Sequence, residues 1–342
     1  MVISKYKAND SFILILFLSY MLLMLASLRP IGFDADSISY FEMMKSIISN
    51  KVDFSVEPTF VWIVKSSYFL LGNDYYQRFT LFIYALINIS LIVIIIKKLS
   101  INPLFSILTY SFLFYPILTL TQIRFGVASA IFLFAIPYIY NRNLFLYLIT
   151  IFVAIMFHVS IIILLPFYFL NSQRIKKQYY VLLFVYAIII AFINTNLKDI
   201  VLNHLDYFPN FIATKLYVYL HVYGEDSKFF DINIFNSFSL FIMSIYLFCL
   251  YHIQKFKSKY SILLIKILGW GIFLYTLSSF FPTLSIRILN VLGLTSILLL
   301  AEIIYLFKQK AIVFILIFSI LVLMFYNIDM RHELLNFGVF YE

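Results

Sequence analysis

Apolar runs separated by short polar connections fill the sequence from one end to the other. A helix needs about 20 mainly apolar residues to cross the hydrocarbon of a bilayer, with roughly 17–25 as the usual range. The pattern therefore predicts an all-α polytopic membrane protein with about eleven transmembrane helices. The predicted segments are residues 12–28, 79–96, 103–120, 123–140, 144–157, 159–170, 179–193, 236–253, 261–281, 286–306 and 311–326.

Charges in the connections indicate how these segments are oriented. Cytoplasmic connections are rich in Lys and Arg, and Lys5 and Lys7 precede the first segment, which predicts a cytoplasmic N-terminus. Alternating the segments leaves only basic charges in the cytoplasmic connections: Lys97, Lys98, Arg142, Arg174, Lys176, Lys177, Lys255, Lys257, Lys259, Lys308 and Lys310. The opposite side receives Asp34, Asp36, Glu42, Asp53, Glu57, Asp74, Asp199, Asp206, Glu225, Asp226 and Asp231.

Two apolar stretches do not fit simple alternation. Residues 59–71 are short and interrupted by Lys65, and a crossing there would place Lys97 outside, so we expect a re-entrant or interfacial helix on the external side. Residues 144–170 form either one long helix or two short helices that meet near His158. The two-helix hairpin is favoured because it keeps the basic residues at both ends, Arg142 and Arg174, on the cytoplasmic side.

Two external segments, residues 29–78 and 194–236, are long enough to hold a site. Residues 37–48 predict an amphipathic helix on the membrane surface, with Ile38, Phe41, Met44 and Ile48 on one face. No internal repeat of fixed period is visible. We therefore expect residues 1–342 to form a single integral membrane domain.

Composition excludes a water-soluble enzyme. Hydrophobic residues make up 63% of the chain and charged residues 12%, against roughly 45–50% and 25% in typical soluble chains. The mean hydropathy is +0.99. The net charge of +9 does not indicate nucleic acid, because the basic residues lie in short clusters between apolar runs. The lone Cys249 rules out an intrachain disulfide framework, and we expect no cleavable signal peptide.

Polar groups at membrane depth are costly unless they are paired or hydrated, so each is a candidate site residue. Arg124 either extends to lipid headgroups or binds phosphate, and the nearby Gln122 favours a polar, close-packed face. Arg287 is a second candidate, with an interfacial anchor as the alternative. His158 is either a structural histidine that hydrogen-bonds within a helix turn or a site residue. No second histidine lies at metal-ligand spacing, so we do not expect a histidine metal site.

The acids near the predicted outer face complete the set of candidates. Asp36 and Tyr40 share one helix face, four residues apart. Glu57 precedes Pro58 at a helix start, where its charge could be purely structural. One topology places these groups with Arg124, His158 and Arg287 near the outer leaflet. Arginines that neutralise a leaving diphosphate, and a carboxylate that takes a hydroxyl proton, suit chemistry on a diphosphate-linked lipid.

The sequence resembles the EpsG/Wzy-type polysaccharide polymerases, bacterial membrane proteins that extend O-antigen or exopolysaccharide chains. The motifs that carry the resemblance are Arg29…Gly32-Phe33-Asp34-Ala35-Asp36…Tyr40, Glu57-Pro58-Thr59-Phe60, Ile123-Arg124-Phe125-Gly126-Val127-Ala128 and Ala154…Phe157-His158-Val159-Ser160. Where the family often has Gly-Thr-Asp, either Asp34 or Asp36 could match, and the spacing to Tyr40 favours Asp36. Phe125 stands where the family often has Gln.

The resemblance implies a metal-independent glycosyltransferase of the C-type membrane fold, without a cofactor. It would join undecaprenyl-diphosphate-linked oligosaccharide repeat units at the periplasmic face of the bacterial inner membrane, in O-antigen or lipopolysaccharide synthesis. Membrane lipid and a chain-length regulator protein are expected partners, and nucleic acid is not. The residues carried over from the family are Asp36, Glu57, Arg124 and His158. We predict Asp36, Glu57 and His158 as catalytic residues, and as substrate-binding residues Arg124, Arg287, Tyr40, Gln122 and Asp34.

Three other classes fit parts of the pattern. A flippase or other transporter of the lipid-linked unit would show inverted repeats and broken helices at the midplane, whereas the ionisable groups here gather toward one face. An O-antigen ligase-like enzyme or a polyprenyl-phosphate glycosyltransferase would use the same arginine and carboxylate chemistry. A membrane scaffold would leave the outer arginines and acids unexplained.

Overall fold

The computed structural model describes residues 2–51, 56–170, 173–193, 204–207, 233–327 and 335–336. Within these ranges the chain is helical, apart from an isolated antiparallel bridge between Asp34 and Leu335. The predicted all-α class is therefore confirmed for the described chain. Most of the predicted external segment 194–236 lies outside the described residues, as do Asp53, Asp199, Glu225, Asp226 and Asp231.

The chain divides into two compact units. The first comprises residues 1–172, 255–261 and 297–342, and the second comprises residues 173–254 and 262–296. The prediction of a single membrane domain stays a prediction. Helices of the second unit are α7 (Lys177–Ile193), η4 (Leu205–Tyr207), α11 (Ser237–Tyr251), η6 (Ile253–Lys255), α12 (Ser261–Leu277) and α13 (Pro282–Gly293). The last residue of η6 and the first residue of α12 are assigned to the first unit.

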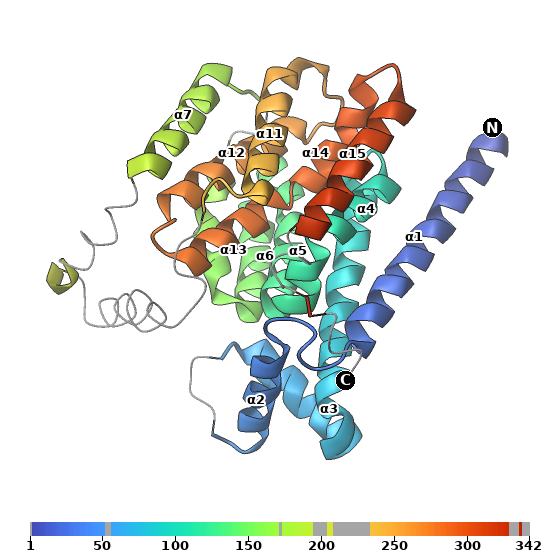
Figure 1. Cartoon of the computed structure of the whole chain (residues 1–342), viewed down its shortest axis with the longest axis vertical. Helices are drawn as coiled ribbons and strands as arrows, with labels where there is room; N and C mark the ends of the chain where they lie inside the picture. The colour runs from blue at the N-terminus through green and yellow to red at the C-terminus, as the bar shows by residue number, and fades with distance from the viewer. Residues whose placement is uncertain are drawn as a thin grey trace. The chain divides into compact units, whose positions relative to one another are not determined.

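The first unit contains the helices that carry most of the candidate residues (Figure 1). In it, α3 packs against both α1 and α5, and α6 packs against α5. Its elements are α1 (Val2–Leu28), α2 (Ser37–Ile48), α3 (Pro58–Leu99), α4 (Pro103–Leu113), η1 (Pro116–Thr121), α5 (Ile123–Tyr140), α6 (Leu144–Phe157), η2 (Val159–Phe169), α14 (Ser296–Ile303), η7 (Ile304–Leu306) and α15 (Lys310–Phe325), of which α14 begins at the unit boundary.

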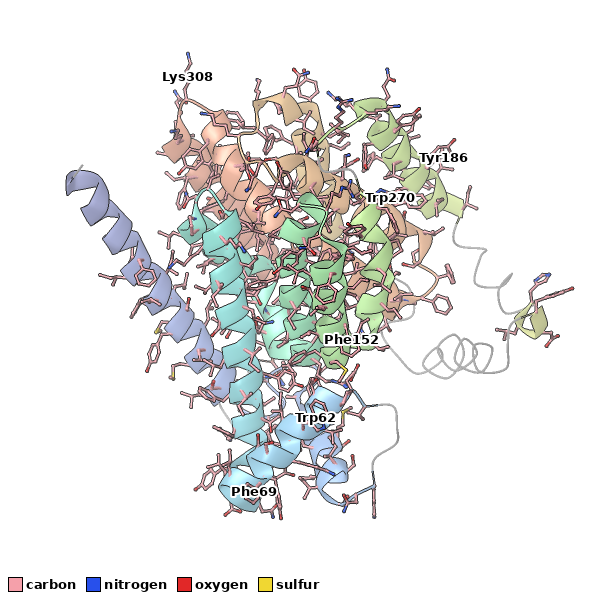
Figure 2. The ribbon with its side chains drawn as sticks, turned by 180° about the vertical axis from the view of Figure 1, so that it is seen from behind. Trp62, Phe69, Phe152, Tyr186, Trp270 and Lys308 are labelled. Atoms are coloured by element: carbon pink, nitrogen blue, oxygen red, sulfur yellow. The ribbon has the colours of Figure 1, made fainter. Side chains whose placement is uncertain are left out.

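Helix α3 joins the predicted re-entrant helix to the next predicted span. Its interior contains a kink at Gly72, whose φ of 69° lies in the left-handed region that glycine tolerates. The part before the kink exposes Trp62 and Phe69, which Figure 2 shows near the end of the molecule where α3 begins. This part of α3 packs against α2, and the two lie side by side below α5 and α6 in the view of Figure 1.

The amphipathic helix predicted at residues 37–48 is confirmed as α2. Only part of its predicted apolar face is buried within the protein. Phe41 and Met44 are buried as expected, whereas Ile38 is 56% exposed. The buried face turns instead toward Tyr40 and Ile47, because α2 packs against α3 rather than facing only lipid.

The predicted break at His158 is confirmed. Helix α6 ends at Phe157 and the 3₁₀ helix η2 begins at Val159. The far ends of the two helices meet, since Arg142 donates to the Tyr168 carbonyl at 2.7 Å and Tyr168 donates back to the Arg142 carbonyl at 2.8 Å. The stretch is therefore a hairpin with His158 at its tip.

Two other predicted spans differ from expectation. The span at 103–120 becomes α4 followed by the π-helical turn η1, which starts at Pro116, a residue without a backbone N–H for the α-helical ladder. The span at 286–306 begins instead at Pro282 and bends by 42° between α13 and the helix that follows.

By length and composition, two described helices could cross a membrane, Pro58–Leu99 and Ile123–Tyr140. The bent pair Pro282–Gly293 and Ser296–Leu306 could form a third crossing, and several shorter apolar helices accompany them. These helices make the chain a membrane protein with several apolar segments. The count of about eleven crossings stays a prediction.

Candidate active site

Glu57 stands at the start of α3, where a carboxylate could simply have stabilised the helix end. The structure argues against that simple role, because its side chain makes no capping hydrogen bond to the helix. The carboxylate instead accepts a hydrogen bond from Nη1 of Arg124 through Oε2, and its Oε1 lies 3.9 Å from Nδ1 of His158. Only 10% of the Glu57 side chain is exposed.

Arg124 is the second residue of α5 and follows directly on the π-helical turn and Gln122. Its guanidinium carbon lies 5.1 Å from the ring centre of Phe60 and 5.6 Å from that of Tyr40. Aromatic faces attract a guanidinium and help to hold it where water is scarce. Nε is buried and has no hydrogen-bond partner among the described residues. The side chain, 16% exposed, thus keeps a donor available beside its carboxylate partner.

His158 combines a structural and a site role. The His158 side chain caps η2: its Nδ1 accepts from the backbone N–H of Ser160 at 3.3 Å and lies 2.9 Å from the Ser160 hydroxyl. An acceptor at Nδ1 places the ring proton of the neutral imidazole on Nε2. The ring packs edge-on against Phe125 at 5.3 Å. The turn predicted for a structural histidine is therefore present, and the same turn brings His158 to Glu57.

A further contact joins the chain segments on which this cluster depends. Thr59 donates to the Met156 carbonyl at 2.7 Å, which fastens the beginning of α3 to the end of α6. Glu57 and His158 each lie two residues from that bond. This hydrogen bond, from the Thr59 hydroxyl to a backbone carbonyl, helps to bring the carboxylate close to the imidazole.

The other predicted residues are distributed around or away from this cluster. Asp36 occupies the residue before α2, partly exposed, and its carbonyl accepts from the Tyr40 N–H at 3.0 Å. Tyr40 is buried and reaches the Arg124 guanidinium. Gln122 has a buried Oε1 without a partner among the described residues. Arg287 belongs to α13 in the second unit. Its buried Nε also lacks a hydrogen-bond partner among the described residues.

Asp34 lies in a different environment from Asp36. Its carboxylate pairs with Nε of Arg29 at 2.7 Å, and the two side chains are 0% and 1% exposed. Arg29 also donates to the Ala26 carbonyl and, at 2.8 Å, to the Leu120 carbonyl. We call Arg29 and Asp34 with these contacts the Arg29 clamp. This geometry gives Asp34 a structural task, and its predicted substrate contact stays a prediction.

The sequence reasoning missed several buried polar residues, among them Glu302 and Asn88 in the first unit. Glu302, 3% exposed, accepts from the Ser261 hydroxyl at 2.9 Å and from the Ser258 N–H at 3.3 Å. Asn88, 1% exposed, accepts from Tyr110 at 2.7 Å. Both lie inside predicted apolar spans, so the rule that polar groups at membrane depth are candidates would have found them.

Within the described part of the chain, no three His, Cys, Asp or Glu side chains are grouped as a metal ion would require. The cluster can instead bind an anion through Arg124 and accept or relay a proton through a carboxylate or His158. Its parts come from α2, α3, the start of α5 and the α6–η2 hairpin.

The helices and this cluster define a membrane protein with a partly buried arginine–carboxylate–histidine group. The model of the EpsG family matches residues 12–340, nearly the whole chain, and the chain belongs to that family. Comparisons with curated proteins and with solved structures gave no significant match. Family membership supports a polysaccharide polymerase-type role in broad terms.

Proposed function

We propose that the chain is a glycosyltransferase that polymerises O-antigen or exopolysaccharide repeat units. Its donor would be the growing glycan on undecaprenyl diphosphate, and its acceptor the non-reducing end of an incoming lipid-linked unit. The observation that carries the proposal is the Arg124 guanidinium, which lies over the two adjacent rings of Tyr40 and Phe60 and pairs with Glu57, itself close to His158. Membership of the EpsG family supports the same reaction class.

Arg124 is proposed to hold the diphosphate. Its fork geometry suits phosphate oxygens, it stays charged at any working pH, and its low exposure strengthens the attraction. Arg287 is proposed as a second diphosphate ligand, with Tyr40 and Gln122 contacting the sugar or phosphate groups. Guanidinium charge would thus neutralise the leaving group, and the proposed reaction is metal-independent.

The proposed reaction is a displacement at the anomeric carbon. A hydroxyl of the acceptor sugar attacks that carbon, and the new glycosidic C–O bond forms as the bond to the diphosphate oxygen breaks. The diphosphate departs with the bonding electron pair, and the hydroxyl proton passes to a carboxylate. His158, with its proposed proton on Nε2, would orient a neighbouring group or contact the diphosphate.

Asp36 is the preferred base, with Glu57 as the alternative. Oε2 of Glu57 already accepts a hydrogen bond from Nη1 of Arg124, so that oxygen is engaged in the ion pair. Asp36 is partly exposed at the start of α2, four residues before Tyr40. Glu57 would then serve mainly to position Arg124.

We place the reaction at the periplasmic face of the bacterial inner membrane, with the N-terminus cytoplasmic. The charge pattern of the connections supports this orientation. A C-type membrane fold and a chain-length regulator protein as partner complete the proposal. The sugars, the linkage and the chain length are features of the substrate that the proposed site must accept.

The glycan made by a deletion strain tests the reaction class. A polymerase is expected to leave single repeat units on the lipid A core, because ligation continues without polymerisation. A flippase or an O-antigen ligase would leave no repeat on the core, which would overturn the proposal. Complementation with the wild-type chain must restore the ladder of long chains, as a control for effects on neighbouring genes.

A further inference from the structure

Arg124 follows a π-helical turn, a rare conformation that is common at functional sites. The turn, η1, closes when the Gln122 N–H donates to the Ile117 carbonyl at 2.7 Å. Such a wide turn is less stable than α-helix, so something outside it must hold it in shape. The contacts around η1 show what does so.

Three consecutive residues of η1 are each held by a different part of the first unit. The Leu118 carbonyl lies so close to Gly126 that a Cβ added there would come within 1.7 Å of it. Thr119 joins a buried polar group formed with Asn88 and Tyr110. The Leu120 carbonyl accepts from Arg29 at 2.8 Å.

The polar group at Thr119 is compact and fully enclosed. The Tyr110 hydroxyl lies 2.7 Å from Oδ1 of Asn88 and 2.7 Å from the Thr119 hydroxyl, which itself lies 3.1 Å from the same Oδ1. The three side chains are 1%, 1% and 2% exposed. One residue from α3 and one from α4 therefore fasten the middle of the turn. Buried hydrogen bonds of this kind favour one arrangement of the helices that contribute them.

The same asparagine also meets the first turn of α5. Its Nδ2 lies 2.9 Å from where a Gly126 Cβ would stand, and it has no hydrogen-bond partner among the described residues. Gly126 is two residues beyond Arg124. The asparagine thus touches the chain before and after the arginine, and its position sets where the guanidinium can lie.

We propose that Asn88, Tyr110 and Thr119 are positioning residues for Arg124, acting by fixing the π-helical turn from which the arginine departs. This inference rests on the proposed function, in which Arg124 binds the diphosphate. Small shifts of a binding group are costly, since a misplacement of about 1 Å can lower the rate about a hundredfold. Loss of one hydroxyl from the group should cost less than that.

The test measures the affinity of the detergent-solubilised full chain for farnesyl diphosphate. We expect Tyr110→Phe and Thr119→Val to weaken binding about tenfold, while Thr119→Ser, which keeps the hydroxyl, stays within about twofold of wild type. The matched control is Tyr246→Phe in the second unit, a buried tyrosine whose hydroxyl donates to the Tyr180 carbonyl at 2.8 Å. It should bind as wild type.

Two comparisons distinguish positioning from general destabilisation. Tyr110→Phe in an Arg124→Lys background should add less than about a twofold loss. Arg124→Lys already removes the guanidinium that Tyr110 is proposed to position, so the two losses should not add. Wild-type affinity of Tyr110→Phe, or an additive loss in that background, would overturn the inference. Wild-type affinity of Arg124→Ala would overturn the proposed role of Arg124 itself, which is a separate failure.

Discussion

Among the described residues of the first unit, two arginine–carboxylate pairs differ in how completely the guanidinium is used. In the Arg29 clamp, Nε donates to Asp34 and the two terminal nitrogens donate to backbone carbonyls, with at most 1% of either side chain exposed. In the other pair, Arg124 donates to Glu57 from Nη1, its Nε has no partner among the described residues, and it is 16% exposed.

The difference separates a structural ion pair from one that suits a ligand. A sealed pair with every group satisfied can only hold its helices together. A pair with an unused donor, aromatic walls and partial access to solvent can exchange its anion. Position relative to the helices does not distinguish them, because both arginines lie at helix ends and both pair with an acid. The two pairs differ in the number of hydrogen-bond acceptors that surround each guanidinium.

The largest effect on folding is expected from Arg29→Ala. It leaves Asp34 charged and buried without its partner, which typically costs about 3–5 kcal/mol. We expect little folded protein in the membrane and a strongly lowered unfolding temperature in detergent. An Arg29→Ala protein as stable as wild type would remove the distinction between the two pairs.

Asp36→Asn is expected to act on turnover and not on folding. The change keeps the shape of the side chain but removes its ability to take a proton, and general-base catalysis typically contributes at least about a hundredfold. The measurement is the rate of chain extension per folded protein in vesicles that contain lipid-linked repeat units. Full activity would exclude Asp36 as the base and leave Glu57 as the candidate.

Neutralising the two carboxylates compares the pairs directly. Glu57→Gln should lower the free energy of unfolding by about 1 kcal/mol, because the pair is partly exposed and Gln retains an acceptor. Asp34→Asn makes the same chemical change in the sealed pair and should cost distinctly more. Thermal unfolding of both variants in one detergent gives the comparison; equal losses would contradict it.

The smallest effect is expected at the edge of the Arg29 clamp. The Asn336 N–H donates to the Phe33 carbonyl at 2.7 Å, next to the bridge between Asp34 and Leu335. Asn336→Pro removes that donor and should cost about 0.5–1.5 kcal/mol. Asn336→Ala keeps the donor and, because the side chain is exposed, is the matched control. Identical unfolding temperatures for the two variants would show that the bond contributes nothing.

Local patterns in the sequence predicted the elements well. The bounds of α2 and the break at His158 followed from periodicity and from the charges at the ends of the apolar runs. The approach of Glu57, Arg124 and His158 followed from one assumed topology. These features depend on short-range signals or on the cost of polar groups in an apolar medium.

Other features depended on packing that no local pattern records. The π-helical turn before Arg124 is contacted by Asn88, Tyr110 and Arg29, which come from distant parts of the chain. The buried face of α2 is set by α3, which is why Ile38 ends exposed. Glu302 was overlooked for a different reason: the acids were counted only in the connections, although this one lies within an apolar run.

The most direct test of the central claim is polymer made per folded protein for Arg124→Lys and Arg124→Ala in the deletion strain. Lysine preserves the charge beside Glu57 but lacks the planar fork for phosphate oxygens. We predict near-normal amounts of folded protein in the membrane for Arg124→Lys. Chain extension should fall at least about a hundredfold in Arg124→Ala, and Arg124→Lys should lie between Arg124→Ala and wild type. Polysaccharide of wild-type length from Arg124→Ala, at a normal level of folded protein, would contradict the account.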